Sequence, residues 1–329
     1  MRAIIGRMRN VIPLAACIGF AFLSSVDAQT HNLNWAAGSP GGAWHTQVTG
    51  IAALISEKNP DIAFHLFPGG GKDNPTRIQS GESQVGTGID FLSQAAKEGK
   101  APYSQVHDKV RTLGLTGIEQ QFMIYVSADE TRSLAELLKE PKVSYGVTPQ
   151  ATTEYLTLAR ALEFYKSSPD QITQGGGKVI VASYGDLIQG FKDGKFEVFW
   201  TAGEIPSGVA AQVVQGPRKV KLLPFPDDLR NYLQSKFGYG KGLLKADTYP
   251  QLQNTDLAVT TDKNIYLASV DLSDDLAYRI TKTIIQNRDR LPKIYSALGA
   301  YDPSTAWNVS AVPLHKGAER AFREAGYLK

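Results

Sequence analysis

Residues 32–58 read NLNWAAGSPGGAWHTQVTGIAALISEK, and this stretch sets the pattern for the rest of the chain. Asn32 to Ala37 predict a strand, because polar and apolar side chains alternate at its start. Trp44 to Lys58 predict a helix whose apolar face is formed by Val48, Ile51 and Ile55. A strand, a glycine-rich turn and a helix therefore follow one another directly.

The same alternation of strands and helices continues along the chain. Strands are predicted at residues 62–67, 84–87, 111–116, 121–126, 143–147, 179–182, 198–200 and 257–270, the last interrupted at Asp262-Lys263-Asn264. Helices are predicted at residues 77–81, 91–98, 134–139, 153–165 and 186–193, and the end of the chain is helix-rich from Asp274 onward. Such alternation is typical of an α/β protein with a mostly parallel sheet flanked by helices.

The order of these segments predicts two lobes. The strands at 121–126 and 257–270 stand where the chain would leave one series of elements and return to it. We therefore expect an α/β two-lobed clamp with two crossing hinge segments. Lobe I comprises residues 29–119 plus 250–329, and lobe II comprises residues 120–249.

Composition sets outer limits on function. The chain has 329 residues, 35 Lys plus Arg against 32 Asp plus Glu, and one Cys. A length of this order suggests about two globular domains with a substantial core in each. The charges are too balanced for a nucleic-acid-binding surface, so we expect no nucleic-acid partner.

The first residues have the pattern of an export signal. Arg2, Arg7 and Arg9 precede an uncharged stretch, and Val26-Asp27-Ala28 supplies small residues for cleavage. Residues 1–28 are thus predicted to be a signal peptide cleaved after Ala28, which places the protein in the periplasm. A membrane anchor is one alternative; another is lipidation at Cys17, since Leu14-Ala15-Ala16-Cys17 matches a lipoprotein box. Cleavage at Ala28 would leave no cysteine, which excludes disulfides.

Sequence motifs of catalysis are missing. Ala37-Gly38-Ser39-Pro40-Gly41 departs from the G-x-S-x-G elbow of serine hydrolases, and neither S-x-x-K nor H-E-x-x-H occurs. The glycine-rich strings fit neither a P-loop nor a dinucleotide fingerprint. We therefore expect no catalytic residue, no metal and no cofactor, and a protein that is not an enzyme.

One sequence pattern recurs: a turn of glycine and hydroxyl residues follows a strand and precedes a helix. The carboxyl ends of strands face the binding crevice of open α/β sheets, and helix N-termini there offer unpaired N–H groups. Such turns also occur merely as caps, but several at the same edge indicate a site for an anionic or polar ligand. The turns are Gly38-Ser39-Pro40-Gly41-Gly42, Pro68-Gly69-Gly70-Gly71, Gly86-Thr87-Gly88, Thr148 to Thr153, and Thr201-Ala202-Gly203.

These turns and the signal together resemble the TAXI family of extracytoplasmic solute-binding proteins, which serve TRAP transporters. The likeness covers nearly the whole chain after residue 28. It is carried by the ordered strings Gly38 to Trp44, Gly69-Gly70, Ile78 to Glu82, Phe191 to Lys195, Thr201 to Pro206, Leu222-Leu223-Pro224, Val312 to Ala318 and Phe322 to Gly326. Two departures stand out: Gln150-Ala151-Thr152-Thr153 replaces a smaller turn, and Lys316 replaces a proline.

The resemblance implies a monomeric clamp that closes on a small anionic or zwitterionic ligand, an organic acid or amino acid of dicarboxylate or glutamate-like type. It also implies delivery to the membrane permease of a TRAP transporter. The residues implied as ligand-binding are Ser39, Gly41, Gly42, Ala43, Trp44, Gly70, Thr87 and Asp90 from the first lobe, and Thr148, Thr152, Thr153, Thr201 and Gly203 from the second.

Other interpretations of the same residues remain open. Trp44 also fits a core position, and Asp90 also fits a helix cap. Glu204 could meet an ammonium group of the ligand, although we expect it to point to solvent. Two other functions are compatible with the sequence: a periplasmic ligand sensor that feeds a signalling receptor, and a periplasmic enzyme.

Overall fold

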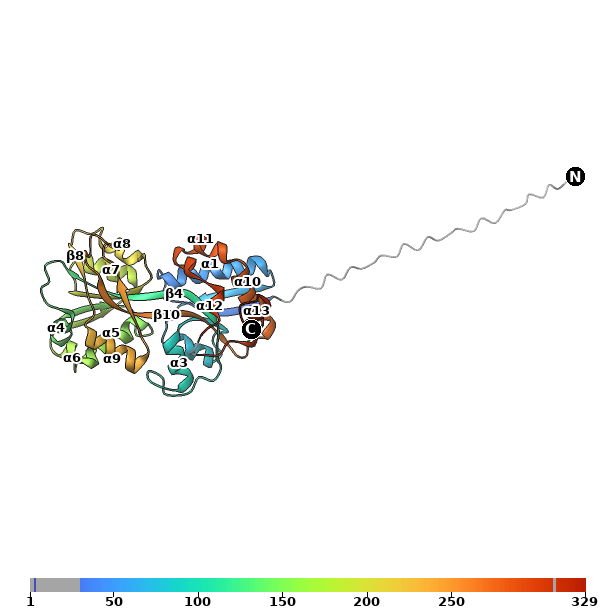
Figure 1. Ribbon diagram of the computed structural model, residues 1–329, viewed down its shortest axis with the longest axis horizontal. Coiled ribbons are helices and arrows are strands. Elements are labelled where there is room, and N and C mark those ends of the chain that lie inside the picture. Colours follow the sequence, from blue (N-terminus) through green and yellow to red (C-terminus); the bar gives the residue numbers. More distant parts are fainter. Residues whose placement is uncertain (1–2, 4–29, 310–311) are drawn as a thin grey trace.

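The computed structural model describes residues 3, 30–309 and 312–329 and shows two α/β halves joined by a pair of long strands (Figure 1). The α/β fold is as predicted. The predicted signal peptide, with Cys17 and the cleavage point at Ala28, lies outside the described residues. Within the described residues, no helix has both the length and the apolar character needed to cross a membrane.

Ten strands form a single sheet with the order β2-β1-β3-β10-β4-β7-β5-β6, while β8 pairs with β4 and β9 with β10. The strands are β1 (His31–Ala36), β2 (Ile62–Phe67), β3 (Val85–Ile89), β4 (Val110–Ser127), β5 (Ser144–Val147), β6 (Lys178–Val181), β7 (Val198–Gly203), β8 (Val220–Leu223), β9 (Gly240–Leu244) and β10 (Leu257–Ser269). The α-helices are α1 (Ala43–Lys58), α2 (Asn74–Gln79), α3 (Asp90–Glu98), α4 (Leu134–Lys139), α5 (Thr153–Phe164), α6 (Pro169–Gln174), α7 (Tyr184–Lys192), α8 (Gly208–Val213), α9 (Asp227–Phe237), α10 (Asp274–Gln286), α11 (Leu291–Ile294), α12 (Pro303–Ala306) and α13 (Lys316–Glu324).

The first half is built around the strand–turn–helix unit of residues 32–58. β1 pairs in parallel with β2 and β3, so the turns that follow these strands meet at one edge. Trp35 is fully buried and makes edge contacts with Phe64 and Tyr266. α1 packs against α10, and α10 packs against α13, so the C-terminal helices complete the core that the first strand begins.

The second half has a core on each face of its sheet. Leu158 of α5 and Leu229 of α9 lie in one core with Trp200 of β7. Leu187 of α7 and Val213 of α8 lie in the core on the other face. Figure 1 shows α7 and α8 above this sheet and α5, α6 and α9 below it.

Two long antiparallel strands connect the halves. β4 pairs with β10 from Val110 to Gln121, then continues along β7 and β8. The sequence predicted separate strands at 111–116 and 121–126; this was wrong, because Glu119 and Gln120 pair with Lys263 and Asp262 and the ladder therefore passes through the polar stretch. The expected break in the 257–270 segment is a register shift between Lys263 and Ile265, within one continuous strand.

The sheet is mixed, not mostly parallel as predicted. Pairs among β1, β2 and β3 and among β5, β6 and β7 are parallel, but both crossing strands run antiparallel to their neighbours. A chain that passes out and back through the centre of the sheet requires this reversal. We retain lobe I (29–119 plus 250–329) and lobe II (120–249) as proposed bounds of the two halves.

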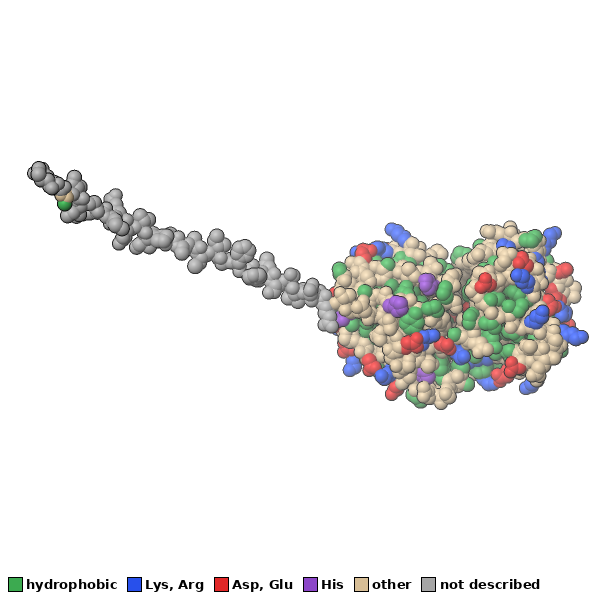
Figure 2. Space-filling model, turned by 180° about the vertical axis from the view of Figure 1, so that it is seen from behind, with side chains coloured by type: hydrophobic (Ala, Val, Ile, Leu, Met, Phe, Trp, Pro, Cys, Tyr) green, Lys and Arg blue, Asp and Glu red, His purple; other side chains and the backbone are tan. Residues whose placement is uncertain are grey.

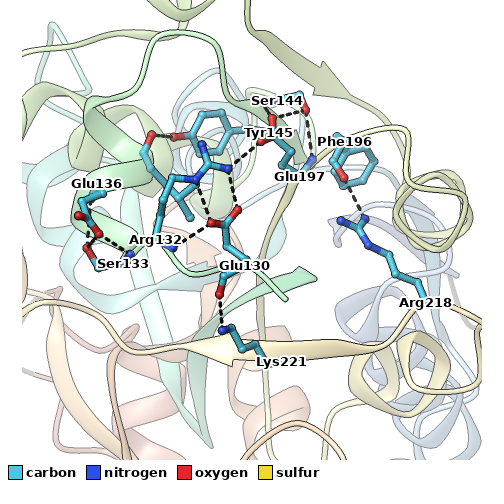
Figure 3. Close-up of polar contacts among 11 residues, drawn as sticks. Glu130, Arg132, Ser133, Glu136, Ser144, Tyr145, Phe196, Glu197, Arg218 and Lys221 are labelled. Atoms are coloured by element: carbon cyan, nitrogen blue, oxygen red, sulfur yellow. Dashed lines mark hydrogen bonds and ion pairs between the residues drawn. The ribbon is translucent and has the colours of Figure 1, made fainter. Parts of the chain in front are cut away.

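A network of polar side chains links the loop before α4 to β5 and to the residue before β7 (Figure 3). Arg132 donates to Glu130 Oε2 at 2.6 Å and to Glu197 Oε1 at 2.9 Å. Glu197 Oε2 in turn accepts from the Ser144 N–H at 2.9 Å, which links the loop before α4 to β5. The hydrogen bonds from Arg132 lower the pKa of Glu130 to about 2.

This network predicts a pH-dependent stability difference. Arg132→Met should lower the free energy of unfolding at pH 7 by about 1 kcal/mol, since the guanidinium is partly exposed. The pKa of Glu130 is depressed in the folded state, so the pair stabilises fully above its ordinary value of 4.5 and loses this effect as the pH falls to about 2. Urea denaturation should therefore show the wild type and variant converging across that window; an equal gap at pH 7 and pH 2 would contradict the assignment.

Candidate functional site

A cavity of about 280 Å³ lies between the two halves. Figure 2 shows the halves as two rounded bodies with a hollow between them on the face drawn. The cavity's volume is near the lower limit for small-molecule sites, which suits a ligand of few heavy atoms. The lining residues are Gly38, Ser39, Gly41, Gly42, Ala43, Trp44, Thr46, Gly69, Gly70, Gly71, Gln120, Thr152, Thr153, Glu154, Tyr184, Gly185, Ile188, Ala202, Gly203, Glu204, Ser207, Gly208, Val209, Gln212 and Tyr295.

The structure brings most of the predicted site residues together at this cavity. Those in the lining are Ser39, Gly41, Gly42, Ala43, Trp44, Gly70, Thr152, Thr153 and Gly203. Four predicted residues lie outside the lining: Thr87, Asp90, Thr148 and Thr201. The predicted turns therefore do converge, but not every side chain in them reaches the open space.

Each of the four remaining residues has a partner within the protein. The Thr87 hydroxyl accepts from Trp35 Nε1 at 3.3 Å, and the Thr201 hydroxyl donates to the Met123 carbonyl at 2.9 Å. Thr148 shares a hydrogen bond of 2.8 Å with Thr152. Asp90 accepts from the Phe91 N–H at 2.8 Å, and burial raises the pKa of its carboxyl. The alternative role of Asp90 as the cap of this helix was wrong: Ile89 stands at the cap position of α3, and Asp90 is the first residue of the helix.

The first turn of α1 forms one wall of the cavity. Gly42 precedes the helix in extended conformation, and no side chain caps the first turn. Gly41 has a φ of 78°, in the left-handed region that favours glycine, so the turn can reverse before the helix begins. Among the described residues, the N–H groups of Ala43 and Trp44 have no acceptor, which leaves positive partial charge directed at this end of the cavity.

The second half supplies a similar wall from α5 and α7. The Thr152 hydroxyl caps α5 by accepting from the Tyr155 N–H at 3.4 Å, while Thr153 and Glu154 begin the helix at the cavity. α7 begins at Tyr184 and Gly185, which also line the space. Helix N-termini from both halves therefore meet at one cavity, an arrangement that attracts anions.

The halves touch directly beside the cavity. The contact joins the glycine-rich turn at Gly69 to Lys72 to the turn at Gln150 to Thr153, which has no glycine. The Lys72 N–H donates to the Ala151 carbonyl at 3.2 Å. A Cβ atom at Gly70 would stand 2.8 Å from the carbonyl carbon of Ala151, closer than side chains pack. The larger residues at Gln150 to Thr153 are thus matched by glycine in the facing turn.

Asn74 is a buried positioning residue that no motif or periodicity in the sequence indicated. Its Nδ2 lies 2.9 Å from the Ala37 carbonyl and 2.7 Å from the Thr87 carbonyl, and its Oδ1 accepts from the Gly70 N–H at 3.0 Å. The side chain is fully buried. One amide therefore holds the turns after β1 and β2 in a fixed relation to strand β3.

Trp44 both packs in the core and faces the cavity. It is 8% exposed and lies in the lining. With the Gln120 amide oriented to donate to Asp262 Oδ1, its oxygen accepts from Trp44 Nε1 at 3.2 Å. Burial and the neighbouring Asp90, Glu154 and Glu119 raise the pKa of Asp262 well above its ordinary value. The indole is thus tied to both crossing strands.

Two glutamates line the cavity, and only one of them was considered from the sequence. Glu154 Oε1 accepts from the Tyr184 hydroxyl at 2.6 Å, and burial raises the pKa of this carboxyl. Glu204 was expected to point to solvent, and this was wrong: it is 4% exposed and accepts a hydrogen bond from the Tyr295 hydroxyl. That bond joins the loop after β7 to the C-terminal part of the first half.

The lining combines apolar side chains with polar groups, of which only two are carboxyls. No Lys, Arg or His lies among the lining residues. In the part of the chain that the structure describes, no group of three or more His, Cys, Asp or Glu residues is placed to hold a metal ion. Backbone N–H groups, hydroxyls, the amides of Gln120 and Gln212 and two carboxyls are therefore the polar groups available to a ligand.

Comparison with known proteins gives one family and several structural likenesses. The model of the NMT1-like family matches residues 35–326. A Xanthomonas citri protein bound to ATP is 11% identical and matches 90% of this chain and 96% of that chain, with a TM-score of 0.50. An ancestral arginine-binding protein bound to arginine is 15% identical over 81% of this chain and 96% of its own, with a TM-score of 0.46. A putative L-cystine ABC transporter from Listeria monocytogenes is 11% identical over 83% and 97%, with a TM-score of 0.48.

Proposed function

The chain belongs to the NMT1-like family, and we propose that it is an extracytoplasmic solute-binding protein. The proposed ligand is a small organic acid or amino acid, held in the cavity between the lobes and released unchanged. The observation that carries this proposal is the convergence of the first turns of α1, α5 and α7 on one cavity that no Lys or Arg lines.

Closure between the lobes would work through contacts on both walls. A ligand that accepts hydrogen bonds from α1 in lobe I and α5 in lobe II binds the closed form more tightly than the open form, and so shifts the population toward closure. β4 and β10 would act as the hinge, because they are the strands that pass through both halves.

The partner and the location follow from the resemblance to the TAXI family. We propose delivery of the ligand to the membrane permease of a TRAP-type secondary transporter, by a monomeric protein in the periplasm. The signal predicted at residues 1–28 supports that location, with lipidation at Cys17 as the alternative route to the same compartment. The protein would act by binding alone, without a cofactor.

A thermal-denaturation screen of small monocarboxylates, dicarboxylates and amino acids tests the function. At least one compound should raise the melting temperature; at a hundredfold excess over its Kd it should add about 2.7 kcal/mol to the free energy of unfolding. The compound should be recovered chemically unchanged after incubation. Turnover of the compound, or a panel in which nothing stabilises the protein, would contradict the proposal.

A further inference from the structure

Glu204 is a buried carboxyl in which one oxygen has no hydrogen-bond partner among the described residues. It follows β7 directly, lines the cavity and is 4% exposed. Its Oε1 accepts from the Tyr295 hydroxyl, whereas its Oε2 is buried with no hydrogen-bond partner among the described residues. A buried polar atom without a partner costs free energy, so a ligand that donates to this oxygen would supply what the described part of the chain does not.

Among the described residues, no cation lies beside Glu204 to compensate its charge. Tyr184 and Tyr295 are its neighbours in the lining, and Tyr249 lies close by with its hydroxyl accepting from the Ser207 N–H at 2.6 Å. Glu204 forms no ion pair with the Lys, Arg and His residues that the structure describes. A buried carboxylate is stabilised by a cation that pairs with it, and the cavity that Glu204 lines has room for such a partner.

The second glutamate of the lining, Glu154, has no buried oxygen without a hydrogen-bond partner. Glu154 is bonded to the Tyr184 hydroxyl, and its atoms are not among those left buried without a partner. Glu204 therefore differs from Glu154 in having one oxygen bonded to the opposite lobe and the other oxygen buried without a partner among the described residues.

We propose that Glu204 forms an ammonium site in the cavity, so that the ligand is a zwitterion of amino-acid type and not a dicarboxylate. This inference rests on the proposed binding function. The ligand's carboxylate would lie against the N–H groups at the start of α1 and α5, and its ammonium group would donate to Glu204 Oε2. A second carboxylate in that place would be repelled by Glu204, which gives the site a means of rejecting dicarboxylates.

Calorimetric titration with matched pairs of compounds tests the ammonium site. The probes are L-glutamate against glutarate, L-leucine against 4-methylpentanoate, and L-alanine against propanoate, each on the wild type and on Glu204→Gln. At least one amino acid should bind the wild type tenfold or more tightly than its partner without the amino group. Glu204→Gln should reduce this ratio of affinities at least tenfold, mainly by weakening the binding of the amino acid.

Glu82→Gln is the matched control, because Glu82 is an exposed glutamate outside the lining whose side chain is 52% exposed. It should leave the ratio unchanged. The ammonium site would be overturned if an acid without an amino group bound tightly and Glu204→Gln left the ratio of affinities unchanged. The binding function would then still stand. If no organic acid or amino acid binds the wild type, both proposals fail; the wild-type ratios decide the question even if Glu204→Gln does not fold.

Discussion

Replacing Gly70 by alanine should weaken ligand binding about tenfold or more while leaving the stability of the unliganded protein nearly unchanged. The added methyl would stand 2.8 Å from the carbonyl carbon of Ala151 in the opposite half, where carbon atoms normally stay about 3.5–4.0 Å apart. The clash exists only when the halves meet. Relieving it should cost about 1–3 kcal/mol, and each 1.4 kcal/mol changes affinity about tenfold.

Calorimetry with the compound that stabilises the wild type most in the thermal screen measures this effect. Gly299→Ala is the matched control, because its added carbon would lie 3.4 Å from Pro292 and outside the cavity lining. The control should bind like the wild type. Wild-type affinity in Gly70→Ala would show that the contact between these two turns is not needed for binding.

Replacing Asn74 by alanine should lower the free energy of unfolding by about 3 kcal/mol or more. The side chain is fully buried and serves the Ala37 and Thr87 carbonyls and the Gly70 N–H. Its removal leaves several buried backbone groups without a partner, at about 1–3 kcal/mol for each group that water cannot reach.

Urea denaturation of Asn74→Ala against the wild type measures this loss. Asn231→Ala provides the comparison, since Asn231 is exposed and bonds only the exposed Lys241 side chain. It should change the free energy of unfolding by less than about 0.5 kcal/mol. A loss below about 1 kcal/mol for Asn74→Ala would mean that water or a rearranged turn replaces the amide.

The fold was predictable because its signals are local. The alternation of strand and helix in residues 32–58 recurs along the chain, and the turns between these elements have glycine where the backbone must reverse, as at Gly41 with its φ of 78°. The continuity of β4 was not predictable, since its polar middle is supported by pairing with Asp262 and Lys263, far away in the sequence.

Within the candidate site, backbone positions were predicted better than side-chain directions. Ser39, Gly42 and Gly70 line the cavity because the turns themselves converge there. Thr87 and Thr201 do not, because each lies within a strand, where neighbouring side chains point to opposite faces and a shift of one position reverses the direction.

Asn74 and Glu204 illustrate the limit of sequence reasoning for the site. Asn74 contacts backbone groups of two turns and of strand β3, and Glu204 contacts Tyr295, 91 residues away in the chain. No periodicity or motif encodes such contacts. Their roles depend on the folded arrangement, in which a polar side chain is buried beside a specific partner.

We expect a small ligand with a carboxylate group to lie between the lobes, against the first turns of α1 and α5. A crystal structure of the protein with the compound that stabilises it most in the screen tests this most directly. Carboxylate oxygens should lie about 2.7–3.2 Å from the N–H nitrogen of Ala43 or Trp44 and from that of Thr153 or Glu154. A ligand bound at any other surface, or held by one lobe alone, would contradict the account.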